Sequence, residues 1–186
     1  MKKVLFAAFL LVSSNAIFAQ INQGNWMVGG NVNFTHSKIG DAKSNHFNIS
    51  PDAGYFFIDQ LAAGLRLNYG SDKVKGADDA STDWTVSPFV RYYFLPSGQM
   101  VNIFVDGSYG FGKTGDKDKV SYNQFEFMAG PAVFLSPNVA LEFALFYRSK
   151  GGDAYKTLTS DDRLNQFGVN IGFQIHLGNG GGTAKK

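Results

Sequence analysis

The segment FEFMAGPAVFLSPNVALEFALFYR, at residues 125–148, alternates with a period of two, which restricts what the chain can fold into. Its odd positions are apolar before and after the turn at 136–138, whereas its even positions include Glu126, Glu142 and Arg148. A lipid-facing helix of this length would tolerate neither the carboxylates nor the prolines. A period of two across a Ser-Pro-Asn turn predicts a β-hairpin with one apolar face and one partly charged face.

The same alternation recurs in further segments, which lie at residues 25–37, 46–57, 61–70, 83–94, 101–112 and 165–177. With the hairpin they predict eight strands, most of them long enough to cross a bilayer when tilted, for which ~9–11 residues suffice. The links at 58–60, 95–100 and 136–138 are short, and those near 36–44, 70–82, 112–121 and 149–162 are long and polar. The sequence therefore predicts an all-β fold, an eight-stranded antiparallel up-and-down transmembrane β-barrel, with its long loops at one end.

The first residues form a separate element. Lys2 and Lys3 precede a short apolar run, and the small-residue ending Ala-Ile-Phe-Ala closes at Ala19, as in a secretory signal peptide cleaved before Gln20. The alternative, a first membrane helix, is disfavoured because the apolar run is short. We expect a cleaved signal peptide at 1–19, a barrel at 20–178 and a short flexible tail at 179–186.

Composition excludes two further classes of function. Removal of Lys2 and Lys3 leaves 17 − 2 = 15 basic residues against 15 acidic ones, so the mature chain has a formal charge of zero. No nucleic-acid partner is therefore expected. The chain has no cysteine, which rules out disulfides, thiolate nucleophiles and cysteine metal sites.

Lysine placement separates a membrane barrel from a soluble sandwich or lipocalin, whose strands also have one apolar face. A solvated sheet face would normally carry several lysines. Outside the signal peptide and the last two residues, all lysines fall in the four expected long loops: Lys38, Lys43, Lys73, Lys75, Lys113, Lys117, Lys119, Lys150 and Lys156. None is expected in a strand or short turn, which favours a barrel embedded in a membrane.

Charged residues on the inward faces form two expected pairs. If the link after Phe57 is a three-residue turn, Asp52 lies opposite Arg66. If the Ser-Pro-Asn link is also a three-residue turn, Glu126 lies opposite Arg148. Further lumen charges are expected at Arg91, Asp106 and Glu142. We interpret the pairs as buried ion pairs that let a narrow lumen tolerate charge, and the alternative is a charge gate in a pore.

Aromatic side chains gather toward the ends of the expected strands, as in the two interfacial girdles of a membrane barrel. The girdle near the short turns is expected to contain Trp26, Tyr55 and Tyr92. The girdle near the long loops is expected to contain Tyr69, Trp84, Tyr109, Tyr122 and Tyr147.

Three prolines, Pro51, Pro88 and Pro131, fall inside expected strands. Each removes a hydrogen-bond donor from the ladder between strands. We therefore expect a β-bulge at each of these prolines.

A signal peptide, eight alternating strands, short turns on one side and long charged loops on the other resemble the small outer-membrane β-barrel family of Gram-negative bacteria, which is OmpX-like and similar to the OmpA transmembrane domain. The resemblance covers essentially the whole mature chain and rests on patterns rather than on signature residues. One departure is that GNGGGTAKK follows Leu177, so the chain does not end on an aromatic strand residue.

The resemblance implies a location in the bacterial outer membrane, with periplasmic termini, a periplasmic tail and extracellular long loops. The implied partners are outer-membrane lipids and lipopolysaccharide, the barrel-assembly machinery during biogenesis, and an extracellular partner that contacts the long loops.

For function, we expect a structural or surface-interaction role of the adhesion or defence type, without a large pore, because eight strands enclose just enough room for their own side chains. The alternatives are a narrow channel or carrier for small solutes and an enzyme that modifies lipid A. The lipid A deacylase pattern places a serine two residues after a histidine on one strand face, whereas Ser37 directly follows His36. We expect no catalytic, cofactor-binding or metal-binding residues.

Overall fold

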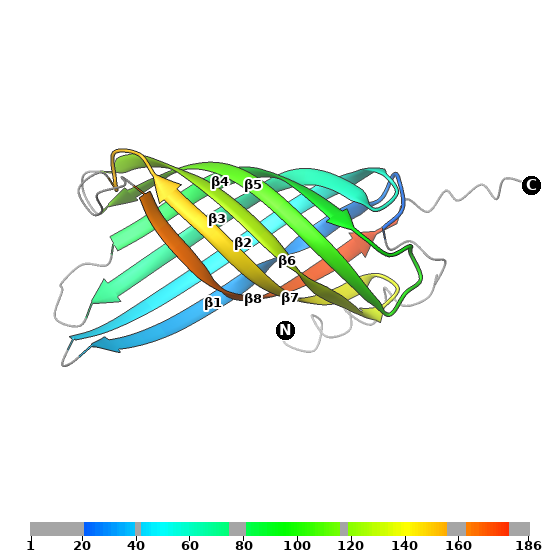
Figure 1. Ribbon diagram of the computed structural model, residues 1–186, viewed down its shortest axis with the longest axis horizontal. Helices are drawn as coiled ribbons and strands as arrows, with labels where there is room; N and C mark the ends of the chain where they lie inside the picture. Colours follow the sequence, from blue (N-terminus) through cyan, green and yellow to red (C-terminus); the bar gives the residue numbers. More distant parts are fainter. Residues whose placement is uncertain (1–20, 40–41, 75–80, 116–118, 156–162, 179–186) are drawn as a thin grey trace, which may run out of the picture.

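The chain forms a closed barrel of eight antiparallel strands, as the computed structural model in Figure 1 shows. The structure describes residues 21–39, 42–74, 81–115, 119–155 and 163–178. The strands are β1 (Trp26–Ile39), β2 (Ala42–Ile58), β3 (Leu61–Val74), β4 (Ser81–Tyr93), β5 (Val101–Gly115), β6 (Val120–Ser136), β7 (Val139–Gly151) and β8 (Arg163–Leu177). The expected fold class is confirmed. The expected signal peptide and tail lie outside the described residues.

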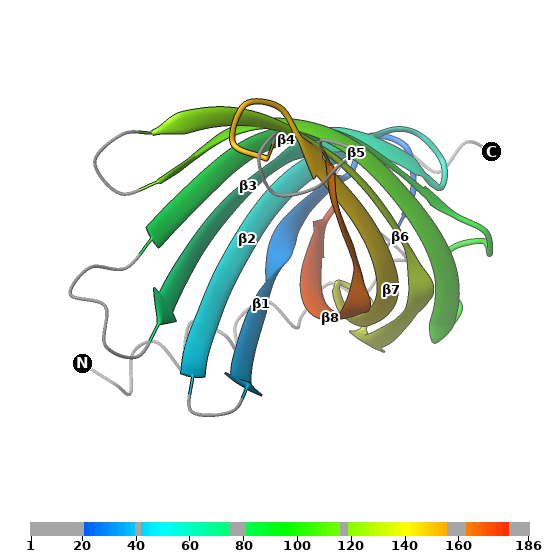
Figure 2. The same ribbon diagram turned by 60° about the vertical axis from the view of Figure 1, so that its left-hand side comes forward.

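Each strand pairs with its neighbours in sequence, and β1 closes the barrel by pairing with β8. Figure 2, in which the long-loop end of Figure 1 is turned forward, shows the strands surrounding a single lumen. Within the described residues there is no helix long and apolar enough to cross a membrane.

The strands extend further toward the long loops than the sequence predicts. Parts of the segments near 36–44, 70–82, 112–121 and 149–162 are strand rather than loop. The expectation that no lysine lies in a strand is therefore wrong, and the lysines found near strand ends are Lys38, Lys43, Lys73, Lys113 and Lys150. Ladder hydrogen bonds between backbones do not depend on apolar side chains, so pairing continues past the apolar part of each strand.

Two of the short connections are tighter than expected. Ile58 pairs with Leu61 and Ser136 pairs with Val139, which leaves two residues in each turn. A register shift lies next to each turn, between Phe56 and Ile58 and between Phe134 and Ser136. Each shift adds one unpaired residue, which compensates for the shorter turn. The ladders above these shifts therefore have the register that a three-residue turn would give.

The expected bulges at the prolines are wrong. The pairs on either side of Pro51, Ile49 with Tyr69 and Asp52 with Arg66, keep one register. The register is likewise unchanged across Pro88 between β4 and β5 and across Pro131 between β6 and β7. The described register shifts lie beside the turns instead, where the strands reverse direction.

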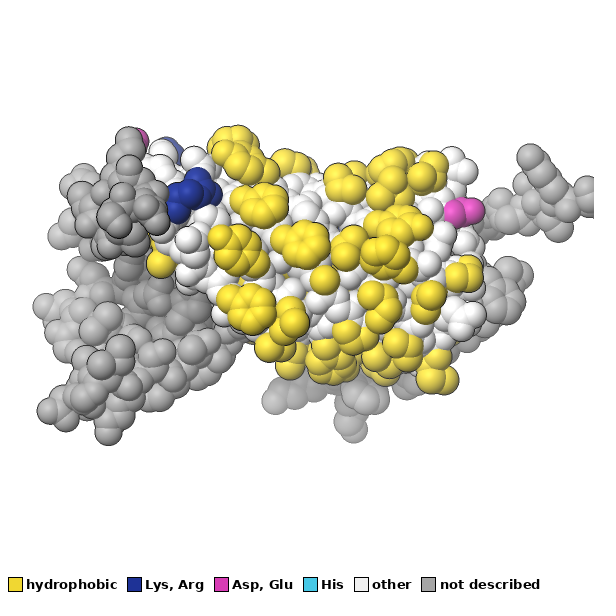
Figure 3. All heavy atoms as spheres, viewed as in Figure 1, with side chains coloured by type: hydrophobic (Ala, Val, Ile, Leu, Met, Phe, Trp, Pro, Cys, Tyr) yellow, Lys and Arg dark blue, Asp and Glu magenta, His cyan; other side chains and the backbone are white. Residues whose placement is uncertain are grey.

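The barrel wall separates an apolar outside from a mixed inside. Figure 3 shows apolar side chains over the middle of the face in view and charged side chains only near the two ends. The outward residues include large exposed hydrophobics such as Leu67, Val90 and Phe111, whereas alternate residues on the same strands are buried inside. This arrangement is typical of a barrel whose outer wall contacts lipid.

The segment before β1 closes the short-turn end. Ile21 is fully buried, and its carbonyl accepts a hydrogen bond of 2.7 Å from the backbone N–H of Gln60. Gly24 donates to the carbonyl of Phe56, whose own N–H donates to Asn25. These bonds fix residues 21–25 across the β2–β3 turn.

Candidate functional site: the closed, charged lumen

Arg66, on β3, is the centre of the lumen network. Its guanidinium contacts Asp52 on the neighbouring strand at 3.3 Å and Asp106 on β5 at 3.0 Å. It also approaches Glu126 on β6 at 3.5 Å. The side chain is 1% exposed, so a single cation is surrounded by three carboxylates away from bulk water.

Arg91, on β4, forms the second centre. Its Nε donates to Asp106 at 3.0 Å, and its Nη1 donates to both carboxylate oxygens of Glu142 at 2.9 and 3.0 Å. The hydroxyl of Tyr93 donates to Glu142 at 3.0 Å. Asp106 therefore connects the two arginines.

Glu126 connects the network to the long-loop end, because it accepts hydrogen bonds from Arg148 as well as from Arg66. The Arg148 side chain is 19% exposed, against 2% for Glu126. Water thus reaches one end of a chain of alternating charges. The register places Asp52 opposite Arg66 and Glu126 opposite Arg148, as the sequence predicts, but joins the two pairs into one network.

We call this network the charge ladder, and it comprises Asp52, Arg66, Arg91, Asp106, Glu126, Glu142 and Arg148. Four carboxylates and three guanidinium groups give it a formal charge of −4 + 3 = −1. Phe89 and Phe104 lie against the arginines, with Arg66 4.9 Å from the Phe89 ring centre and Arg91 4.6 Å from that of Phe104. Buried ions are tolerated when paired and hydrogen-bonded in this way.

A second group, which we call the apolar plug, fills the short-turn end. It comprises Ile21, Met27, Phe56, Tyr93, Phe104, Phe134 and His176. The His176 ring lies 5.3 to 6.1 Å from the rings of Phe56, Tyr93 and Phe134, and neither ring nitrogen has a hydrogen-bond partner. Tyr93 belongs to both groups, because its ring packs in the plug and its hydroxyl contacts Glu142.

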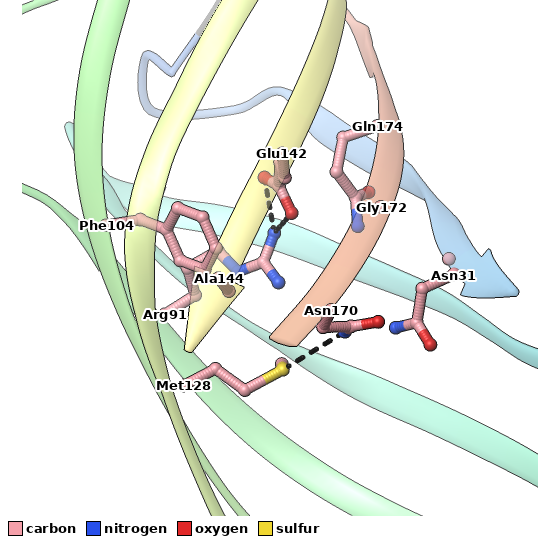
Figure 4. A pocket seen from close by; sticks show the side chains of 10 residues that line it. Asn31, Arg91, Phe104, Met128, Glu142, Ala144, Asn170, Gly172 and Gln174 are labelled. Atoms are coloured by element: carbon pink, nitrogen blue, oxygen red, sulfur yellow. Dashed lines mark hydrogen bonds and ion pairs between the residues drawn. The ribbon is translucent and has the colours of Figure 1, made fainter. Parts of the chain in front are cut away.

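A small cavity lies beside the charge ladder, among the side chains that the structure describes. Figure 4 shows a cavity beside the Arg91–Glu142 ion pair, with the amides of Asn31 and Asn170 facing each other across it. Its volume is about 10 Å³. That volume holds about one water molecule.

The expectation that Tyr122 belongs to the aromatic girdle on the outer wall is wrong. The side chain is 4% exposed and points into the lumen, where its hydroxyl hydrogen-bonds Thr85 and donates to Asp83 at 3.1 Å. Lys150 contacts Asp83 at 3.5 Å and lies 5.2 Å from the centre of the Tyr122 ring. The period of two already indicated this, because Tyr122 shares its parity with the inward residue Glu126.

The other expected girdle residues are all exposed on the outer wall: Trp26, Tyr55, Tyr69, Trp84, Tyr92, Tyr109 and Tyr147. Trp26 pairs with Tyr55 near the short turns, and Tyr69 pairs with Trp84 toward the long loops. Their placement in two rings at the membrane surfaces stays a prediction.

The lumen offers no arrangement that suggests catalysis among the described side chains. His176 is enclosed by rings, and the side chains of His36, Ser37 and His46 lie outside the described ones. In the part of the chain that the structure describes, no group of three or more His, Asp or Glu residues is placed to hold a metal ion.

The sequence predicts the residues of the charge ladder but not its cross-lumen contacts. Hairpin counting relates only adjacent strands, whereas Arg91 reaches Glu142 from β4 to β7 and Arg66 reaches Glu126 from β3 to β6. Arg91 and Asp106 lie on adjacent strands, but the longer 95–100 link does not fix the register of these strands, so the sequence does not predict this pair.

Comparison with known proteins agrees with this architecture. Residues 4–174 match the family described as outer membrane protein beta-barrel domain. The crystal structure of Neisserial surface protein A (NspA) is similar with a TM-score of 0.61 and 13% identity, covering 82% of this chain and 99% of NspA. The outer membrane protein OprG from Pseudomonas aeruginosa gives a TM-score of 0.56 and 13% identity, covering 87% of this chain and 100% of OprG. No curated protein matches the sequence significantly.

Proposed function

Because the chain belongs to the outer membrane protein beta-barrel domain family and is an outer-membrane barrel, we propose that it is a non-enzymatic surface protein without a large pore. Its role is structural or an interaction of the adhesion or defence type. The barrel wall anchors the chain, and the long loops, which are polar in sequence, present a surface to a partner.

One observation carries this proposal, which is the filled lumen. The charge ladder and the apolar plug occupy successive levels of the same channel, and the cavity beside Arg91 and Glu142 has only about 10 Å³. A solute larger than water would have to separate ion pairs and displace packed rings. A solute crosses an open diffusion pore without either rearrangement.

Planar-bilayer conductance tests the proposal. We expect purified barrel to give no regular current steps at neutral pH, and the doubly truncated variant Phe56→Ala/Phe104→Ala to raise the leak because it removes rings from the plug. Heat-modifiable migration on gels verifies that both proteins are folded. Regular steps from the unmodified protein, equal to those of the truncated variant, would contradict a closed lumen.

We further propose that the termini are periplasmic and the long loops extracellular. The described lysines near the long-loop ends support an amine-labelling test, since Lys113 and Lys119 are exposed there. A membrane-impermeant amine reagent should label intact cells in which surface exposure has been verified. Labelling confined to permeabilised cells would reverse the orientation.

A narrow gated channel is the second candidate, and the charge ladder favours it. Alternating charges give an ion successive partners along the lumen, so movement of the plug together with exchange of partners in the charge ladder would open a polar path. Voltage-dependent steps that disappear in Arg66→Met would support this candidate over a closed barrel.

A further inference from the structure

The wall of the barrel is split at the long-loop end, between the first strand and the last. The described ladder between β1 and β8 has six pairs and ends where Asn31 lies opposite Gly172. Beyond these pairs, residues 32–39 of β1 pair with β2 alone, and residues 163–171 of β8 pair with β7 alone. Figures 1 and 2 show the two strands diverging toward the long loops. We call this unpaired part of the seam the split.

Two glycines lie where the strands diverge. Gly30 has a positive φ of 144°, which favours glycine, and a Cβ there would lie 2.4 Å from the carbonyl oxygen of Ser50 on β2. On β8, a Cβ at Gly168 would lie 2.8 Å from the ring of Phe146, so the backbone packs directly on that ring. Pairing of the two strands within one chain beyond Gly172 would disturb both arrangements. The split is therefore built into the sequence on both of its sides.

The split lies within the apolar part of the outer wall. The outward residues of β8 beside it are Phe167, Val169 and Ile171, and each is more than half exposed. Backbone N–H and C=O groups that face the split find no hydrogen-bond partner in hydrocarbon, and an open sheet edge is not tolerated there. Both edges therefore require a partner strand in the membrane.

The inner face of the wall is also accessible beside the split. One inward row of the register contains Ser108, Glu126, Arg148 and Gln166. Ser108 and Glu126 are buried, Arg148 is partly exposed, and Gln166, which borders the split, is exposed. Exposure along this row increases toward the split, as expected where the wall is incomplete.

Strand direction decides which partner fits the split. β1 runs toward the long loops and β8 runs away from them. A single added strand would be antiparallel to one edge and parallel to the other, whereas two strands of opposite direction would make antiparallel pairs throughout. The split of a second copy, in the same membrane orientation, offers two such strands, because its β8 fits the edge of β1 and its β1 fits the edge of β8.

We propose that two copies of this chain join at their splits, with β1 of each copy paired to β8 of the other. A two-fold axis along the membrane normal relates the copies, as in an isologous dimer. The edges are of similar length, with eight residues at 32–39 and nine at 163–171. The apolar outer faces of the two chains then form one continuous wall.

The dimer goes beyond the proposed function and does not depend on it. The apolar plug lies at the level where β1 and β8 are paired within one chain, since Met27 pairs with His176. The lumen of each copy therefore stays closed below the split, whether or not the copies join.

Cysteine cross-linking provides the test, because the chain has no cysteine. His36 and Phe167 each lie five residues beyond the last pair, Asn31 with Gly172, which is roughly 17 Å along the strands. Two copies with different tags, one with His36→Cys and the other with Phe167→Cys, are expressed together in an outer membrane and oxidised. We expect a product of twice the monomer mass that carries both tags, since facing Cβ atoms on paired strands are about 4.5–5.5 Å apart and a small movement allows a disulfide.

Matched variants separate this pairing from other contacts. Neither single variant alone should cross-link, because the two-fold axis places identical positions on opposite seams. Val169→Cys and Asn165→Cys replace Phe167→Cys in turn, since the proposal fixes the strands and not their register. Leu67→Cys lies on the exposed outer face of β3, away from the split, and should give no product with Phe167→Cys.

Three results, each with heat-modifiable migration as evidence of folding, would overturn the proposal. The first is the absence of a product with both tags at all three β8 positions. The second is a disulfide only within one chain in the double variant His36→Cys/Phe167→Cys, which would mean that the barrel closes its own seam. The third is an equal yield from the Leu67→Cys control, which would indicate random collision. Current steps in the conductance experiment would contradict the closed lumen and leave the cross-linking result unchanged.

Discussion

The charge ladder and the apolar plug share the same strands, but ion pairs stabilise the ladder whereas packing of apolar rings stabilises the plug. Asp52 and Phe56 both point inward from β2, and Asp106 and Phe104 both point inward from β5. All four are buried, yet one level of the lumen is ionic and the next is aromatic. Inward position on a barrel strand therefore fixes burial and not chemistry.

The two levels should respond differently to mutation. In the ladder each charge stabilises the others, so removal of one leaves partners buried and unpaired, and the costs are strongly coupled. In the plug each ring contributes through the volume it fills, so the costs follow cavity size and nearly add for residues that do not touch.

The largest effect is expected for Arg66→Ala. Asp106 keeps Arg91 and Glu126 keeps Arg148, but Asp52 loses its described cation and retains a 2.9 Å hydrogen bond from Gln174. We expect a loss of about 3–5 kcal/mol in unfolding free energy. Denaturant unfolding in detergent or lipid measures it.

The control for Arg66→Ala is the charge-removed double variant Arg66→Ala/Asp52→Asn. It should recover part of the loss, because it removes the unpaired carboxylate. If the loss in unfolding free energy of the double variant equals the sum of the losses of the two single variants, Arg66 and Asp52 are not coupled and the charge ladder does not act as a unit.

The plug should give the next largest effect, through Phe56→Ala. A fully buried ring is removed, for which about 3 kcal/mol is expected. Phe57→Ala is the matched control, because the next residue points outward and is 42% exposed. Its cost should be under about 1 kcal/mol, since lipid occupies the vacated space. Equal unfolding free energies for the two variants would contradict the inside–outside assignment.

The sequence predicts the wall of this barrel better than its interior. Alternation fixes which residues of β2 or β6 point inward, and turn counting fixes Asp52 opposite Arg66 even though the turns themselves are tighter. The cross-lumen contact of Arg91 with Glu142 depends on barrel closure and strand tilt, which no local pattern contains. Tyr122 lies near a strand end, which favours a girdle position, but its parity with Glu126 places it inside the lumen.

Arg148→Ala tests whether the charges at the partly exposed end of the charge ladder are coupled as strongly as those in its buried middle. Its side chain is 19% exposed and Arg66 also contacts Glu126, so the carboxylate keeps one partner when Arg148 is removed. We expect a loss of about 1 kcal/mol, which falls as salt screens the exposed end. Unfolding at low and high salt, with Glu126→Gln and the double variant, gives the coupling. A loss as large as that of Arg66→Ala, and insensitive to salt, would show that the mouth is as dry as the middle.

The last comparison is between two tyrosines. Tyr122→Phe keeps the ring and removes the hydroxyl that contacts Thr85 and Asp83. Asp83 retains Lys150, so the expected loss is about 1 kcal/mol, the net value of a typical hydrogen bond. Tyr109→Phe removes the same group from an exposed outward ring and should change the unfolding free energy by less than about 0.5 kcal/mol. Both tyrosines lie toward the long loops, so the comparison separates the effect of facing inward or outward from the effect of height along the barrel. If Tyr109→Phe cost as much as Tyr122→Phe, the hydroxyl would matter as an interfacial group on either face, and the inward hydrogen bonds of Tyr122 would not be what distinguishes the two rings.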